Sequence, residues 1–303
     1  MNALRAPFPW FGGKSRAAPL IWERFGDVAS YCEPFAGSLA VLLGRPATHL
    51  AATETTNDKD GFVANAWRAI LHDPDATAHS ADWPVNETDL HARHAWLVEQ
   101  RATLEVRLEG DPEYFDARIA GWWLWGIACW IGGGFCSGDG PWVRADGNLV
   151  HLGDAGRGVR DWLASLSERL RRVRVCSGDW SRVVTPAALQ PSASSHGILL
   201  DPPYSAEAGR RATIYACEDQ DVAHAVRAWC LAAPAAYRIA LCGYEGEGHE
   251  ALTDVGWSCE SWVAPGGMQR DKDLGGNRTR ERIWFSPACM RRRQGELFAE
   301  AAE

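Results

Sequence analysis

The sequence predicts an α/β fold built on a Rossmann-like sheet, and three observations support this. Residues 28–32 have the pattern of a short strand, which runs into a turn with a single glycine, Gly37, and then into a helical stretch over 39–44. Strand, glycine turn and helix form the first unit of such sheets. An apolar run over 197–200 is cut off by two prolines, and strand and helix patterns then alternate up to a last strand at 282–285.

The composition is that of an ordinary globular protein, with 46% hydrophobic and 23% charged residues among 303. A net charge of −8 argues against indiscriminate binding of nucleic acid, so any contact with DNA needs a local basic surface.

No apolar run is as long as a membrane span, the first residues lack a signal-peptide core, and the nine cysteines include no Cys-x-x-Cys pair. We therefore expect a cytoplasmic protein with reduced cysteines. His91 and His94 have metal-like spacing but no third ligand nearby, so we expect a solvated helix face and no metal.

The segment over 7–14, Pro-Phe-Pro-Trp-Phe-Gly-Gly-Lys, is the first candidate for a site. Gly12 and Gly13 allow the backbone to approach a ligand closely. Trp10 could cover a purine or a sulfonium, and Lys14 could meet a carboxylate. The alternative is an N-terminal arm that its aromatic side chains pack onto the core.

The turn Glu33-Pro34-Phe35-Ala36-Gly37 follows the first expected strand. It is not the dinucleotide fingerprint, because Gly37 is its only glycine, yet it suits a nucleotide-like cofactor as well as an ordinary α/β turn. A second expected strand, over 48–53, precedes Asn57-Asp58 and a helix. Asp58 is placed to bond a ribose hydroxyl or, alternatively, to cap that helix.

The four residues Asp201-Pro202-Pro203-Tyr204 close the apolar run. Proline cannot continue a central strand, so the motif is expected on a loop at the carboxyl end of that strand, where open α/β sheets bind ligands. The Asp201 carboxylate and the Pro202 carbonyl could accept the two N–H groups of a nucleobase amine, and Tyr204 offers a ring for a flipped-out base. The alternative is a tight turn that carries a carboxylate.

Taken together and in order, these motifs resemble those of the α-group, Dam-type DNA adenine-N6 methyltransferases. The resemblance implies a Rossmann-like seven-stranded S-adenosylmethionine-dependent methyltransferase sheet with an inserted, mainly helical target-recognition domain. It places Trp10, Lys14, Asp58 and Asp201 against the cofactor, the Glu33–Gly37 turn near its methionine part, and Asp201 to Tyr204 around the target adenine. One departure is Leu39, where family members often carry a second glycine.

The chain between the second and third expected strands forms the insertion, over 59–171. It contains a polar helical part, a tryptophan-rich helix over 121–130 and a glycine-rich ribbon with an expected hairpin at Asp146-Gly147. The ribbon could follow a DNA backbone or be an ordinary surface loop. A loop after the Asp-Pro-Pro-Tyr motif is a candidate lid over the flipped base. The arginines of these two segments that we expect to contact DNA are Arg144, Arg157, Arg160, Arg210 and Arg211.

The remaining expectations concern the edges of the fold. Asp179 follows a strand over 173–176 and could approach the adenine of the cofactor. We expect a catalytic domain from residues 1–58 and 172–290, and a flexible tail over 291–303.

The function expected is site-specific methylation of adenine N6 in double-stranded DNA; N4-cytosine methylation and a catalytically silent DNA-binding protein are the alternatives. A phage or restriction-modification setting would suit such an enzyme.

Overall fold

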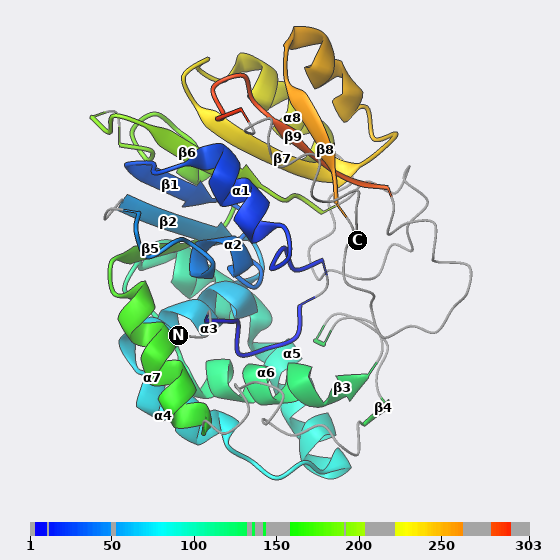
Figure 1. The fold of residues 1–303 in the computed structure, drawn as a ribbon. Helices are drawn as coiled ribbons and strands as arrows, with labels where there is room; N and C mark the ends of the chain where they lie inside the picture. Colours follow the sequence, from blue (N-terminus) through cyan, green and yellow to red (C-terminus); the bar gives the residue numbers. More distant parts are fainter. Residues whose placement is uncertain are drawn as a thin grey trace, which may run out of the picture.

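The computed structural model describes residues 4–10, 12–49, 53–131, 135–136, 142–143, 158–190, 192–203, 222–262 and 280–291. Its centre is a seven-stranded sheet in the order β5-β2-β1-β6-β7-β9-β8 (Figure 1). All neighbouring strands are parallel except at β9, which runs antiparallel to both β7 and β8. This mixed sheet is typical of class I methyltransferases and confirms the predicted fold class. The strands are β1 (Ser30–Glu33), β2 (Thr53–Asp58), β5 (Val173–Ser177), β6 (His196–Leu200), β7 (Arg238–Tyr244), β8 (Ser258–Ser261) and β9 (Glu281–Phe285).

The central strands are buried along their whole length, as expected of a sheet covered on both faces. Every residue of β1 and of β6 is buried, whereas β8, at one edge of the sheet, is mostly exposed. One face packs on the helices α1 (Ala18–Phe25), α2 (Ala40–Leu43) and α3 (Gly61–His72). The other packs on α8 (Val222–Ala232) and the 3₁₀ helices η2 (Trp180–Val183) and η4 (His249–Val255).

The helices between β2 and β5 form a layer on one side of the sheet (Figure 1). After α3 they are α4 (Pro74–Ala81), α5 (Glu87–Gly110), α6 (Ala117–Cys129) and α7 (Val159–Leu170). Side chains of Asp60, Asp73, Asn86 and Asp116 cap α3, α4, α5 and α6 by accepting a backbone N–H of the first turn, which explains where these helices begin. Arg68 of α3 donates to the carbonyls of Leu108, Asp111 and Tyr114 and so fixes the end of α5.

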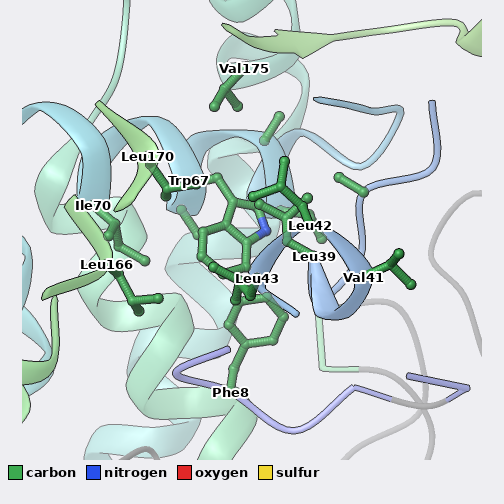
Figure 2. Close-up of a cluster of buried hydrophobic side chains, with 14 of the residues drawn as sticks. Phe8, Leu39, Val41, Leu42, Leu43, Trp67, Ile70, Leu166, Leu170 and Val175 are labelled. Carbon is green, nitrogen blue, oxygen red and sulfur yellow. The ribbon is translucent and has the colours of Figure 1, made fainter. Parts of the chain in front are cut away.

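A core of large side chains joins this helical layer to the first strand-turn-helix unit. Trp67 of α3 is fully buried between Leu39, Leu42 and Leu43 on one side and Leu166 and Leu170 on the other (Figure 2). Phe8 packs against both Trp67 and Trp123, with ring centroids 5.5 Å and 5.0 Å apart. Phe8 therefore anchors the N-terminal segment to the core two residues before Trp10.

One sequence expectation differs from the structure, and two others fall largely on residues that the structure does not describe. The second strand begins at Thr53 and ends at Asp58, so Asn57 and Asp58 belong to the strand itself. Trp142–Val143 (β4) pairs antiparallel with Trp130–Ile131 (β3), and residues 144–150, which carry the expected hairpin turn, lie outside the described residues. Most of the expected tail, 292–303, also lies outside them. Among the described residues, no helix is both long and apolar enough to span a membrane.

Candidate active site

The parallel strands β1, β2, β5 and β6 all end at one edge of the sheet, called here the carboxyl edge. Glu33 ends β1, Asp58 ends β2, Asp179 follows β5 by two residues, and Asp201 follows β6 directly. Four acidic side chains from distant parts of the sequence are thus brought to the same edge. This is where open α/β sheets bind their ligands.

The turn after β1 is built around Gly37, which has a left-handed φ of 44°. Its N–H donates to Asp58 Oδ2 at 2.9 Å, and its carbonyl accepts from Trp67 Nε1 at 2.8 Å. Trp10 lies against the glycine so closely that a Cβ here would stand 2.4 Å from Trp10 Nε1. The N-terminal motif, the glycine turn and the end of β2 therefore form one packed unit.

Leu39 occupies the position at which the family often has glycine, and it too is left-handed, with φ 51°. The side chain is fully buried against the core around Trp67. The turn therefore keeps the backbone conformation that glycine favours, and burial of a large apolar side chain offsets the strain. The turn thus accommodates leucine at a left-handed position.

Asp58 is half-buried and bound by backbone groups at both oxygens. Oδ2 accepts from Gly37, and Oδ1 accepts from the N–H of Asp60 at 2.9 Å. Burial raises the pKa of the Asp58 carboxyl to about 7, although these N–H groups partly lower it. The carboxylate is an acceptor held at a fixed place on the carboxyl edge.

Glu33 lies deeper than the sequence suggested. Its Oε1 accepts from the Tyr31 hydroxyl at 2.6 Å and from the N–H of Leu42 at 2.7 Å, and the residue is 2% exposed. Burial raises the pKa of Glu33 to about 8, and the two donors lower it only in part. Its described hydrogen bonds hold β1 to α2, which gives Glu33 a clear structural role.

Asn57 joins the loops on either side of β2. Its Nδ2 donates to the carbonyl of Pro34 at 3.1 Å and to that of Gly178 at 2.9 Å. The two loops then bring Phe35 and Trp180 together, with stacked rings whose centroids are 6.1 Å apart. The sequence indicated Asn57 only as the neighbour of Asp58.

Asp179 is exposed and caps η2. Its Oδ1 accepts from both the N–H and the hydroxyl of Ser181. The hydrogen bond from the Ser181 hydroxyl holds the pKa of Asp179 below its ordinary value. Oδ1 is therefore engaged by the protein itself, at the loop that leaves β5.

The ion pair between Lys14 and Asp201 is the central contact of the site. Lys14 Nζ lies 2.8 Å from Asp201 Oδ2 and donates to the carbonyl of Gly12 at 2.8 Å. The lysine side chain is 4% exposed and the aspartate side chain 22% exposed. The ammonium also lies 5.6 Å from the ring centroid of Trp262, a residue just after β8 that we did not predict from the sequence.

The rest of the predicted site is placed only in part. Pro202 is buried and Pro203 is half-buried, next to Asp201. Gly13 lies between Gly12 and Lys14, in the short turn closed by the hydrogen bond from Lys14 Nζ to the Gly12 carbonyl. Arg160 of α7 forms an exposed ion pair with Asp75 of α4, at 2.8 Å, and no described contact joins it to the carboxyl edge. The following predicted residues lie outside the described part of the chain: Tyr204, Arg144, Arg157, Arg210 and Arg211.

Metal ligation finds no support in the part of the chain that the structure describes. No group of three or more histidine, cysteine, aspartate or glutamate side chains is arranged there to hold an ion. His94 stacks instead on Trp130, with ring centroids 4.7 Å apart, and burial lowers its pKa. On helix α5, His91 is exposed as the expected solvated face requires, whereas His94 is half-buried.

Part of the chain matches a known family. Residues 10–109 match the family described as D12 class N6 adenine-specific DNA methyltransferase. The matched segment contains Trp10, Lys14, Gly37 and Asp58, and it ends before Asp201. No curated protein matches the chain.

Proposed function

Because the chain belongs to the D12 class of N6 adenine-specific DNA methyltransferases, we propose that Asp201, held by Lys14, aims the target amino group during methyl transfer. The enzyme uses S-adenosyl-L-methionine and methylates N6 of adenine in DNA. The proposal concerns which residues of this chain perform that reaction. The observation that carries it is the 2.8 Å ion pair at the carboxyl edge.

The residues at the carboxyl edge fit the cofactor. The positive φ of Gly37 brings a backbone turn to the edge, and Asp58 offers a fixed carboxylate suited to a ribose hydroxyl. Aromatic faces stand nearby at Trp10, Phe35 and Trp180. We propose that these residues bind S-adenosylmethionine together with Gly12, Gly13, Lys14, Glu33, Pro34, Asp179 and Asp201.

The bound cofactor supplies an electrophilic methyl group on a sulfonium. The chain has to orient the nucleophile, because the lone pair of an exocyclic amine is delocalised into the purine ring. Lys14 binds Oδ2 of Asp201, and no described residue donates to Oδ1. We propose that Oδ1 and the Pro202 carbonyl accept the two N–H groups of the adenine amine, which is catalysis by preorganised hydrogen bonding.

We propose double-stranded DNA as the substrate, with the target adenine flipped out of the helix and stacked on Tyr204. Residues 1–58 and 172–290 form the catalytic domain, 59–171 the insertion for target recognition, and 291–303 a tail. The DNA contacts of this proposal are Arg144, Arg157, Arg160, Arg210 and Arg211. A reducing, cytoplasmic location agrees with the cysteines, all of which are free in the described part of the chain.

The test is transfer of labelled methyl groups from S-adenosylmethionine to DNA by Asp201→Ala. Loss of one preorganised acceptor is expected to lower the rate by about 10²–10³-fold. Glu168→Ala is a control, because its carboxylate is exposed on α7 and paired with Arg171, neither of which is assigned to the site; it should keep the rate within about twofold. An Asp201→Ala enzyme as fast as the control would refute the assigned role.

Arg160 offers a separate test of the DNA contacts. If Arg160 binds a phosphate, Arg160→Ala should weaken binding of duplex DNA and reduce the slope of log affinity against log salt by about one. Arg171, an exposed arginine paired with Glu168, is the control. An unchanged slope for Arg160→Ala would leave this arginine with its ion pair to Asp75 alone.

A further inference from the structure

Within the part of the chain that the structure describes, Asn57 is the residue whose side chain bonds to the loops after both strands that flank β2. It is 1% exposed, and its carboxamide donates one hydrogen bond towards the loop after β1 and the other towards the loop after β5. We propose that Asn57 is a positioning residue for cofactor binding: it sets the spacing of the two loops that enclose the cofactor. This inference rests on the proposed function.

The sheet topology explains why a carboxamide is needed here. β2 lies between β5 and β1, and the regular ladder stops where the three strands end. Beyond that point, the carbonyls of Pro34 and Gly178 need new donors, since an unpaired buried carbonyl is costly. The two N–H groups of one amide satisfy both, whereas a carboxylate, a hydroxyl or an alkyl group cannot.

The backbone carbonyls of Asn57 and Asp58 complete the connection. The Asn57 carbonyl accepts from Ala36 at 2.8 Å, and the N–H of Gly178 donates to the Asp58 carbonyl at 3.0 Å. Each loop is thus tied to β2 through both a main-chain and a side-chain bond. Without the Asn57 side-chain bonds, the loop after β1 stays tied to β2 by the N–H groups of Ala36 and Gly37, and the loop after β5 by the N–H of Gly178. Each loop then keeps its path, but the amide that bonds to both loops and fixes their separation is lost.

The loops held by Asn57 carry groups of the proposed cofactor site. Phe35 comes directly after Pro34, and Trp180 comes two residues after Gly178. Their rings are nearly parallel, at an interplanar angle of 25°. Asn57 therefore controls the relative placement of the two rings, and with it that of Asp179, without needing to touch the ligand.

The first experiment measures the dissociation constant of S-adenosylmethionine by calorimetry for wild type and Asn57→Ala. We expect affinity to fall about tenfold or more, since each lost bond to a buried carbonyl is worth up to about tenfold. The maximal rate at saturating cofactor should change by less than about threefold, because Asp201 and Lys14 are untouched. The effect should therefore appear in KM and not in kcat.

Asn65→Ala is the matched control. Asn65 is also fully buried and makes two hydrogen bonds through its carboxamide, at 2.9 Å and 2.8 Å, but both join α3 to Asp116, at the start of α6. Its loss should lower the melting temperature and leave cofactor affinity within about twofold. If Asn65→Ala weakened the cofactor as much as Asn57→Ala, the effect would be general loosening and the inference would be wrong.

Asn57→Asp adds a readout that a purely structural role does not move. A charged carboxylate faces two carbonyls and cannot donate, but its protonated form can donate one bond. Cofactor affinity of Asn57→Asp, relative to wild type at each pH, should thus recover as pH falls. If Asn57→Ala does not fold, Asn57→Ser, which keeps one donor, should bind about threefold to tenfold more weakly than wild type.

Two outcomes separate this inference from the function it rests on. Wild-type affinity in all the Asn57 variants, with normal binding by wild type, would overturn the inference alone. Absence of cofactor binding by the wild-type protein would overturn the proposed function, and the inference with it.

Discussion

Replacing Gly37 by alanine tests whether the glycine turn and the N-terminal motif form one unit. Gly37 has φ 44°, and an added Cβ would lie 2.4 Å from Nε1 and 3.0 Å from Cε2 of Trp10. These distances are shorter than van der Waals contact, so either the turn or the indole must move. The N–H of Gly37 bound to Asp58 and its carbonyl bound to Trp67 oppose movement of the turn. We therefore expect Trp10 to be displaced.

The magnitude has two parts. A left-handed alanine costs about 1–2 kcal/mol relative to glycine. Displacing Trp10 also loses its packing on Gly37 and its edge-to-face contact with Phe8, with ring centroids 5.9 Å apart; an aromatic contact of this kind is worth about 0.5–1.5 kcal/mol. Gly37→Ala should thus lower the free energy of unfolding by roughly 2–3 kcal/mol. If Trp10 covers the cofactor, cofactor affinity should fall by about tenfold or more.

Chemical unfolding and calorimetric titration with S-adenosylmethionine measure these two effects separately. Gly110→Ala is the control, because Gly110 is the last residue of α5 and an added Cβ there has no neighbour within 4 Å. That change should be neutral or stabilising by up to about 1 kcal/mol. If Gly37→Ala behaved like Gly110→Ala in both measurements, the packing of Trp10 on the turn would have no energetic importance.

Three further substitutions test neighbouring parts of the site. Glu33 has a pKa of about 8 in the folded state against an ordinary 4.5, so the folded protein binds an extra proton between these values. The contribution of Glu33 to the free energy of unfolding therefore falls as pH rises from about 4.5 to 8. Glu33→Gln should flatten that slope in pH-dependent denaturation, except for the part due to Asp58, and an unaltered slope would contradict this. Leu39→Gly relieves a φ of 51° but removes a fully buried side chain, so urea denaturation should show a net loss of about 2 kcal/mol or more; a stabilised variant would show that strain dominates. Lys14→Met leaves Asp201 without its ion-pair partner and should slow methyl transfer by about 10–100-fold with little change in DNA affinity; equal loss of both would point to a folding defect.

The fold could be predicted in outline because its local signals are strong. The strand-turn-helix unit around Gly37, the buried run that ends before Asp201 and the tryptophan-rich helix α6 all appear where periodicity and proline or glycine indicate them. The second strand was expected too early, over 48–53, since its polar residues Thr53 to Asp58 do not resemble a buried strand. In the structure, flanking strands and α3 cover it, and tertiary packing overrides local preference.

The sequence motifs indicate which residues belong to the candidate site, but not which of their side chains contact one another. The sequence indicated Lys14 and Asp201 separately, but their ion pair depends on the sheet order that places β6 beside β1. Trp262 gave no signal, because it reaches Lys14 only through the antiparallel pairing of β8 with β9. Glu33 was expected at the cofactor, whereas its hydrogen bonds to Tyr31 and Leu42 show what else a motif residue can do.

The place of β6 in the middle of the sheet has a consequence for biosynthesis. During translation, β1 and β2 emerge early, but the strand that covers the other side of β1 begins only at His196, after the whole helical insertion. Until then the nascent chain exposes an unpaired edge of β1, a strand whose residues are all buried in the folded protein, and unpaired edges of this kind favour aggregation. The ribosome must also deliver Asp201 before Lys14 has its partner, so a prematurely terminated chain that lacks β6 and the residues after it cannot form the Lys14–Asp201 ion pair.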